Sequence, residues 1–360
     1  YGNMREPEKY RIMVELRCKA LVSDTDFGFA MMREILMESK LGDEKRLKEI
    51  LSMLKTRLQT SFLSAGHTTA VLRSLSYTSP IARFRDITSG IGFYEVVKDL
   101  EENFEERKEL LIENLKKIAG RIFRKENLML SYTSAQEGLA VLEKAVPQFA
   151  DSLHTGEKES HGQWIIHCKK RNEGFRTSSK VQYVARTGNF IDGGAEYTGA
   201  LQILKVILSY DYLWQNVRVK GGAYGCMSGF NRIGEGYLVS YRDPNLEKTM
   251  EIYEGVVDYL KNFDIDDRDM NKFIIGTISN LDRPMNPAAK GSRSLNLYMN
   301  RITEEMIRRE REQILDAQQE DIRGLATVLG AVLAAGELCV IGSEEKIEEA
   351  KEMFGEIRTL

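Results

Sequence analysis

Hydrophobic and polar residues alternate along 10–18 (YRIMVELRC), as they do in a half-buried β-strand. Ser23 and Asp24 can then cap a helix that runs to about Ser39, and Asp43-Glu44 opens a second helical pattern. The elements predicted for the first 150 residues are a strand at 10–18, helices at 23–39, from 43 and at 94–123, a strand at 127–133, and a helix at 134–149.

A polar stretch at 150–162 (ADSLHTGEKESHG) separates this segment from the next. It lacks apolar periodicity and contains Gly156 and Gly162, so it predicts a domain boundary. We expect domains at 1–150 and 163–360, joined by a linker at 151–162. The elements predicted for the second domain are strands at 163–170, 180–187, 223–231, 235–242 and 338–341, a helix at 195–213, helical patterns at 245–262, 267–281, 286–299 and 303–333, and a last helix from Ser343.

The two segments end alike: NLMLSYTSAQEGLAVLEKAV and ELCVIGSEEKIEEAKEMF each give a short apolar strand, a serine-containing turn and an amphipathic helix. The pattern predicts an α+β protein of two repeated two-layer domains, each an antiparallel sheet with helices on one face. Nothing in the first copy matches 163–236, so we expect that domain to be truncated at its N-terminus. Coincidence is the alternative, because such arrangements are common.

Composition narrows the class of protein. The 360 residues are 42% hydrophobic and 29% charged, as in soluble globular domains. A net charge of −3, with no basic stripe, argues against nucleic acid as a partner. No apolar run is long enough for a membrane span, so we expect no membrane partner. The four cysteines are far apart, which indicates neither a disulfide framework nor a thiolate metal site.

The segment WQNVRVKGGAYG at 214–225 carries the most chemical information. Gly221 and Gly222 allow close approach of another chain, while Arg218 and Tyr224 supply hydrogen-bond donors. Such a loop can bind a peptide carbonyl. Equally, the glycines can simply end a helix, with Arg218 near its C-terminal dipole and Tyr224 an ordinary strand residue. The chemistry alone leaves both interpretations open.

The motif RVKGGAYG at 218–225 resembles R-x-K-G-G-A-Y-G of the presequence-protease (falcilysin-like) branch of the pitrilysin/insulinase superfamily. Further similar segments are GHTTA with RSLSYTSP, 184–188, SYRDPN and 302–311. The resemblance implies the C-terminal half of a zinc metalloendopeptidase that degrades unstructured oligopeptides, its third (truncated) and fourth domains. It also implies catalytic roles for Arg218 and Tyr224, which would stabilise the oxyanion, and substrate binding by Arg218, Gly221, Gly222 and Tyr224.

The zinc motif of that family, H-x-x-E-H, does not occur in this sequence. We therefore assign no metal to this chain and expect the N-terminal half, its partner, to hold the Zn²⁺ of the parent enzyme. This chain alone is predicted to be inactive. His161 and His167 with Cys168 form a possible ligand set, but they lie on a linker and a strand, so surface and strand roles are favoured.

Other candidates have structural explanations. We interpret His67 as a packing or hydrogen-bonding residue, and Asp243-Pro244 as the entry to a helix. A second hypothesis for the chain is a non-catalytic binding or structural subunit of a peptidase-like complex. The opening residues Tyr1-Gly2 carry no leader pattern, which we take as a cut inside a longer protein. We expect a bacterial cytoplasm, with an organelle matrix as the alternative.

Overall fold

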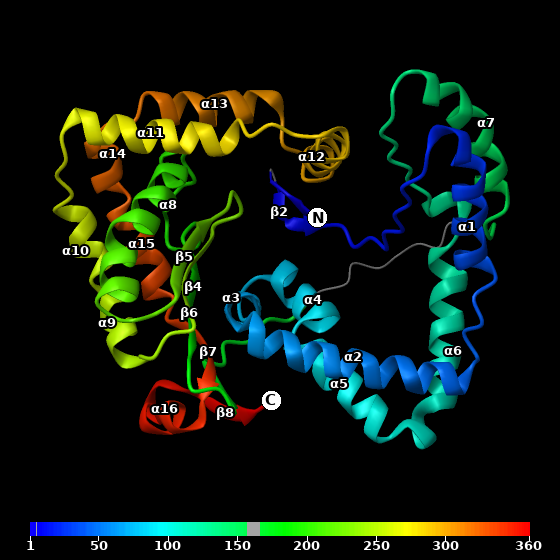
Figure 1. The fold of residues 1–360 in the computed structure, drawn as a ribbon, viewed down its shortest axis with the longest axis horizontal. Helices are drawn as coiled ribbons and strands as arrows, with labels where there is room; N and C mark the ends of the chain where they lie inside the picture. Colours follow the sequence, from blue (N-terminus) through cyan, green and yellow to red (C-terminus); the bar gives the residue numbers. More distant parts are fainter. Residues whose placement is uncertain (5, 157–165) are drawn as a thin grey trace.

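The structure is a computed structural model that describes residues 1–4, 6–156 and 166–360. Figure 1 shows two lobes, one built around a sheet with helices packed on it and the other built of long helices. Residues 157–162 of the expected linker lie outside the described residues. The mixture of helices and one larger sheet confirms the α+β class predicted from the sequence.

The six-stranded sheet belongs to the second segment, in the order β5-β6-β4-β7-β3-β8. Strand β4 pairs antiparallel with β6 and β7, as does β5 with β6, whereas β3 runs parallel to β7 and β8. The crossover through α16 (Glu344–Glu349) returns the chain so that β8 runs in the same direction as β7, on the other side of β3. The strands are β3 (Glu173–Thr177), β4 (Tyr183–Asn189), β5 (Gly225–Phe230), β6 (Glu235–Tyr241), β7 (Glu337–Ser343) and β8 (Glu356–Thr359).

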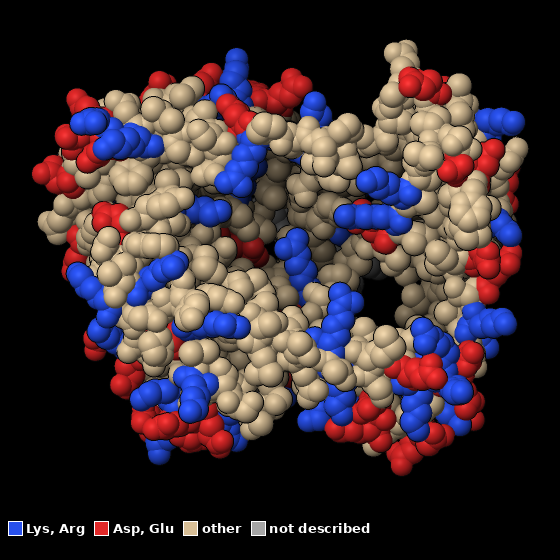
Figure 2. All heavy atoms as spheres, in the orientation of Figure 1, with Lys and Arg blue, Asp and Glu red and all other residues tan. Residues whose placement is uncertain are grey.

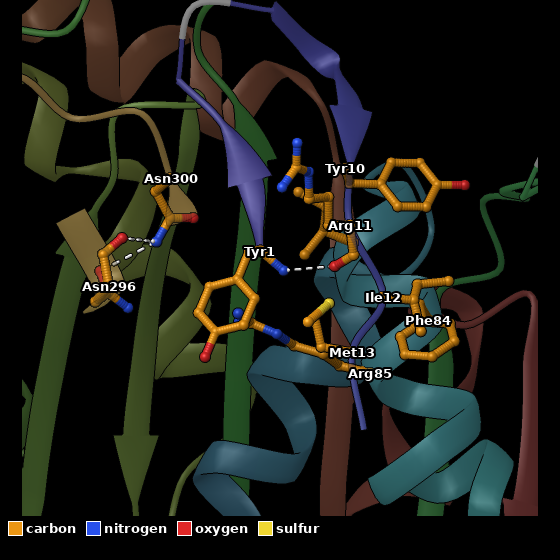
Figure 3. Close-up of a pocket in the computed structure, with 10 residues that line it drawn as sticks. Tyr1, Tyr10, Arg11, Ile12, Met13, Phe84, Arg85, Asn296 and Asn300 are labelled. Atoms are coloured by element: carbon orange, nitrogen blue, oxygen red, sulfur yellow. Dashed lines mark hydrogen bonds between the residues drawn. The ribbon is translucent and has the colours of Figure 1, made fainter. Parts of the chain in front are cut away.

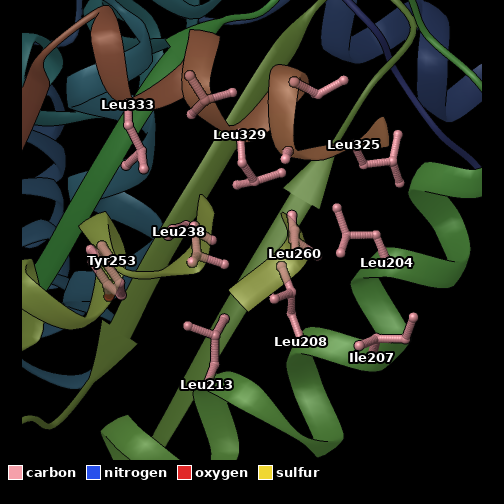
Figure 4. Packing of buried hydrophobic residues seen from close by; sticks show 14 of the residues in the cluster. Leu204, Ile207, Leu208, Leu213, Leu238, Tyr253, Leu260, Leu325, Leu329 and Leu333 are labelled. Carbon is pink, nitrogen blue, oxygen red and sulfur yellow. The ribbon is translucent and has the colours of Figure 1, made fainter. Parts of the chain in front are cut away.

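Helices of the second segment cover one face of this sheet. Helix α8 (Ala200–Tyr210) has apolar residues at helical spacing, and α15 (Ala326–Ala334) is apolar all round. Figure 4 shows Leu204 and Leu208 of α8 facing Leu329 of α15 across the core. Each fully buried leucine contributes about 1.5–3 kcal/mol. The other helices are α9 (Glu247–Glu254), α10 (Val256–Lys261), α11 (Asp267–Leu281), α12 (Pro287–Met299), α13 (Glu304–Leu315) and α14 (Gln319–Gly324), with short turns η3 (Trp214–Val219) and η4 (Lys351–Met353).

The opposite face of the sheet is covered by the first segment. Helix α3 (Gly66–Leu75) lies against β4, β6 and β7, and Phe62 and Ala70 share a core with Tyr183 and Val239. The first-segment elements are β1 (Gly2–Asn3), β2 (Glu6–Tyr10), η1 (Val22–Asp24), α1 (Thr25–Met37), α2 (Glu44–Ser64), α3, α4 (Pro80–Ser89), α5 (Ile91–Glu102), α6 (Phe104–Ile122), η2 (Lys125–Asn127) and α7 (Glu137–Asp151).

Three strand predictions are wrong. Residues 11–18, 128–133 and 166–170 have no regular secondary structure, and β3 begins only at Glu173; residues 163–165 lie outside the described residues. A strand needs a hydrogen-bonding neighbour, and Val14 and Met129 are exposed (58% and 38%) instead of covering a sheet. The sheet predicted for the first segment is therefore not formed by the described residues.

Several helical predictions differ in detail. The pattern at 94–123 is two helices, α5 and α6, which meet at Asn103, and the last helix, expected from Ser343, ends at Glu349 and is followed by the strand β8. The pattern at 303–333 is three helices, because Gln318 and Asp321 form a capping box that starts α14. The pattern at 245–262 is divided at Gly255 into α9 and α10.

Figure 2 shows the molecule hollowed between its two lobes, with lysine and arginine side chains around the hollow.

Candidate functional site

The segment that the sequence singles out connects α8 to the edge strand β5. It begins with the π-helical turn η3, in which the Lys220 amide donates to the Gln215 carbonyl at 3.0 Å. The Arg218 guanidinium is exposed and lies 4.1 Å from the centre of the Trp214 ring, a cation–π contact that holds it against an aromatic face. Arg218 is thus oriented by Trp214 and remains open to solvent.

The glycine pair fixes the path of the backbone out of this turn. Gly222 has a φ of +83°, a left-handed conformation that glycine adopts without strain, and its amide donates to the Arg218 carbonyl at 2.8 Å. At Gly221 a β-carbon would lie 2.4 Å from the Val217 carbonyl oxygen, so no larger residue fits. Asn245 donates to the Gly221 carbonyl at 2.6 Å. The structural interpretation of both glycines is confirmed.

Tyr224 lies at the start of β5 with 67% of its surface exposed. Its amide donates to the Tyr241 carbonyl at 3.0 Å, which ties it to β6. Its hydroxyl makes no hydrogen bond to any described residue. The side chain is therefore anchored through its backbone while its donor faces solvent.

The arginine across the hairpin from Tyr224 is Arg242, and not Arg218, for which the family resemblance implies a role shared with Tyr224. Arg218 contacts Trp214, and no contact joins it to Tyr224 among the described residues. Gly225 pairs with Tyr241, so the next residues outward, Tyr224 and Arg242, lie opposite each other. Arg242 has a φ of +48°, and its guanidinium lies 5.6 Å from the Tyr241 ring centre.

Arg242 was missed because we interpreted its segment as a helix entry. Asp243 is indeed structural: it is fully buried and accepts from the Asn245 amide at 2.9 Å and the Thr249 hydroxyl at 2.6 Å. The helix begins only at Glu247, however, later than we expected. The sequence signal that could have identified Arg242 is the length of the predicted β5–β6 hairpin, because strands of that length place Tyr224 and Arg242 across from each other.

Arg242 belongs to a group that we call the tyrosine–arginine cluster: Tyr183, Tyr224, Tyr241, Arg242 and His67. Interactions with the Tyr183 hydroxyl, and with Tyr241 and Tyr224, raise the pKa of the Arg242 guanidinium. The Tyr183 and Tyr241 ring centres are 5.7 Å apart. These contacts hold a charged side chain in place without an acidic partner among the described residues.

His67 brings the first segment into the cluster. It lies in the first turn of α3, and its ring contacts Tyr241 edge-on, at 4.9 Å and 78°. Burial lowers the pKa of His67, which favours the neutral ring, and its buried Nδ1 has no hydrogen-bond partner in the part of the chain that the structure describes. His67 thus packs as expected, and it packs against the site.

A separate cavity of about 310 Å³ lies between the N-terminal hairpin, α4 and α12. Arg11 and Arg85 line it together with Asn296 and Asn300, and it shares no lining residue with the tyrosine–arginine cluster. In Figure 3 the Arg11 and Arg85 side chains extend in different directions. The two guanidinium groups therefore do not converge on one ligand atom.

Metal ligands and membrane spans were also sought in the described residues. No group of three or more His, Cys, Asp or Glu side chains there is arranged to hold a metal ion. Of the histidines considered as ligands, His161 lies outside the described residues, and His167 and Cys168 belong to no such group. Nor does any described helix combine the length and apolarity needed to cross a membrane.

Comparisons with known proteins bear on the same segments. Residues 172–344 match the family model "PreP C-terminal domain", and residues 1–100 match the model of the domain associated with M16 peptidases of subfamily C. Protein HypA of Clostridium perfringens is 35% identical over 360 residues, 100% of this chain and 37% of that protein. Presequence protease 1, chloroplastic/mitochondrial, of Arabidopsis thaliana is 30% identical over 336 residues, 93% of this chain and 31% of that protein.

The solved structure of pitrilysin aligns with a TM-score of 0.54 at 10% identity, over 88% of this chain and 33% of that one, a likeness of fold alone. The chain belongs to the M16 peptidase family, as a C-terminal half of the presequence-protease type. The family predicted from RVKGGAYG is confirmed. The chain spans about a third of the length of these curated relatives.

Proposed function

We propose that this chain is the C-terminal half of a zinc metalloendopeptidase that degrades unstructured oligopeptides, and that Tyr224 and Arg218 contact the bound peptide. Family membership supports the reaction class. The observation that carries the site is Tyr224: a hydroxyl without a partner in the described residues, 67% of the side chain exposed, on a backbone fixed by β6. An N-terminal half as partner, and its zinc, are part of the same proposal.

The position of Tyr224 suits an extended peptide. Strand β5 is the edge of the sheet, so its outer N–H and C=O groups have no strand partner among the described residues. An unstructured peptide can form main-chain hydrogen bonds with such an edge, whereas a folded protein presents few free backbone groups. This edge therefore supports unstructured peptides as the substrate class.

The chemical contribution proposed for this chain is hydrogen-bond donation. The Tyr224 hydroxyl donates to a peptide carbonyl oxygen and to the oxyanion that forms from it, and the Arg218 guanidinium adds a positive charge oriented by Trp214. Gly221 and Gly222 let the peptide backbone approach the loop. Loss of one such donor costs about 3 kcal/mol of transition-state stabilisation.

Zinc is implied by the M16 metallopeptidase family, but the described residues do not fit a zinc site, because no three potential ligands gather among them. No chemical step of this chain is therefore routed through the metal. The zinc ligands are assigned, within the proposal, to the N-terminal half.

The test is Tyr224→Phe in the full-length protein, assayed with a quenched unstructured peptide. We expect kcat to fall about a hundredfold with an unchanged thermal unfolding midpoint. Tyr210→Phe is the matched control, because Tyr210 is also exposed (70%) and lies outside the cluster. Wild-type turnover of the Tyr224 variant contradicts its role. Peptide binding without cleavage by the wild-type protein favours the non-catalytic subunit instead.

A further inference from the structure

Arg242 has the properties of a binding residue that the proposed function leaves unused. Its φ of +48° is uncommon for a residue with a β-carbon, and such backbones persist only where the surroundings hold them. Backbone hydrogen bonds next to Arg242 hold this conformation. The isolated bridge between Gln182 and Asp243 fixes the backbone just after Arg242, with an amide–carbonyl distance of 2.7 Å from Gln182 to Asp243.

The guanidinium of Arg242 is positioned by aromatic side chains. It lies 5.6 Å from the Tyr241 ring centre, and it interacts with the Tyr183 hydroxyl, which is held in place by donation to the Leu63 carbonyl at 2.6 Å. His67 also contacts the Tyr241 ring, edge-on at 4.9 Å. A guanidinium has five N–H donors, so these contacts leave most of them free.

No acidic side chain among the described residues forms an ion pair with Arg242. The adjacent Asp243 is buried, and its oxygens accept from Asn245 and Thr249. Arg242 is exposed and lies one residue beyond the Gly225–Tyr241 pair that ends the ladder, where the Tyr224 amide is 3.4 Å from the Arg242 carbonyl. An oriented, uncompensated guanidinium beside an exposed phenol is matched by a carboxylate, which accepts two parallel hydrogen bonds from arginine.

We infer that Arg242 is a specificity-determining residue that binds a carboxylate of the peptide close to the carbonyl contacted by Tyr224. The inference rests on the proposed function and names a substrate class for it: peptides with a carboxylate near the bond that is cleaved. Tyr183, Tyr241 and His67 act as positioning residues. Because His67 comes from α3, the first segment contributes to the preference of a site on the second.

The experiment uses the full-length protein and unstructured peptides that differ only by Glu or Gln, with the substitution moved along the sequence. A further pair has a free or an amidated C-terminus, which separates a side-chain carboxylate from a terminal one. We expect the wild-type protein to prefer the carboxylate at one position by about tenfold in kcat/KM. The same preference is expected in affinity, measured by fluorescence anisotropy with chelator present to prevent cleavage.

The key variant is Arg242→Asn, because asparagine tolerates left-handed backbone. It is expected to lose the Glu-over-Gln preference, measured as the ratio of the kcat/KM values of the two peptides with the same variant. Arg242→Lys keeps the charge without the fork and is expected to retain part of the preference. Arg301→Asn is the control: Arg301 also has a positive φ (+58°) and lies 5.5 Å from a tyrosine ring, that of Tyr298.

Each outcome is decisive. A preference that disappears in Arg242→Asn and persists in Arg301→Asn supports the inference. Equal use of Glu and Gln peptides together with equal use of the free and amidated peptides by the wild type, or an unchanged preference in Arg242→Asn, overturns the inference and leaves the proposed function standing. If no peptide binds the wild-type protein, both the inference and the proposed function are wrong. Thermal unfolding of each variant distinguishes a lost contact from a lost fold. The inference is also contradicted if Arg242→Asn retains a preference for the carboxylate over the amide while a folded Arg242→Lys variant shows none.

Discussion

Arg73 and Glu173, a hundred residues apart, form a two-pronged ion pair inside the protein. The Arg73 Nε and Nη2 atoms lie 2.5 and 2.8 Å from the two carboxylate oxygens of Glu173. Arg73 also donates to Asp86 at 2.7 Å, and all three side chains are buried. The pair joins α3 of the first segment to β3 of the second, on the sheet face that also supports the tyrosine–arginine cluster.

The first prediction concerns this ion pair. Arg73→Met leaves two buried carboxylates without their shared cation, so we expect the free energy of unfolding to fall by about 3–5 kcal/mol. Urea unfolding followed by circular dichroism measures it. Arg311→Met is the control, because the Arg311–Asp282 pair has the same two-pronged geometry but is exposed. Similar, small losses in both variants contradict the prediction.

The second prediction concerns pH. Burial raises the pKa of Glu337 to about 7, although Thr78 and Thr187 donate hydrogen bonds to it. The folded protein thus keeps a proton that the unfolded chain releases above its usual pKa of 4.5. The stabilising contribution is present below that value and is lost as pH rises towards 7.

Glu337→Gln replaces the protonated carboxyl group with an uncharged amide of the same shape, which has no carboxyl proton to lose. We expect the variant to exceed the wild-type protein in stability at pH 8 by on the order of 1–2 kcal/mol, and by little at pH 5. Urea unfolding at a series of pH values gives both curves. Parallel curves from pH 5 to pH 8 show that Glu337 does not hold the proton.

The third prediction concerns the packing of α3 on the sheet. A β-carbon at Gly66 lies 2.3 Å from Cδ2 of the Tyr183 ring, so Gly66→Ala forces the helix and the ring apart. We expect a destabilisation of about 1–3 kcal/mol, together with weaker peptide binding because Tyr183 and His67 shift. Gly120→Ala in α6 is the control: nothing lies within 4 Å of its new methyl group, so helix propensity predicts a small gain in stability.

Local patterns in the sequence predicted those elements whose stability is local or whose apolar face is periodic. The spacing of Leu201, Leu204 and Leu208 indicated a helix with one buried face, and α8 has that face in the core. The glycine pair after Arg218 indicated the end of a helical turn. The family motif likewise depends only on residues adjacent in the chain.

The strand at 10–18 shows the limit of such patterns. Its alternation is real, but a strand exists only when another strand supplies hydrogen bonds, and among the described residues this pairing ends at Arg11, which exchanges backbone hydrogen bonds with Tyr1. Strand β3 shows the converse. The strand was not predicted at its observed position because it begins with Glu173. A glutamate is buried in a strand only when a cation such as Arg73 pairs with it, and the local sequence does not show that pairing.

The sequence by itself determined the family, the α+β class and the loop with Arg218, Gly221, Gly222 and Tyr224, because each is written in neighbouring residues. Only the tertiary structure decided which cation lies beside Tyr224. Hairpin register brought Arg242 to it, and the docking of α3 added His67 from more than a hundred residues away. Contacts between distant segments depend on how the whole chain packs, so no local pattern announces them.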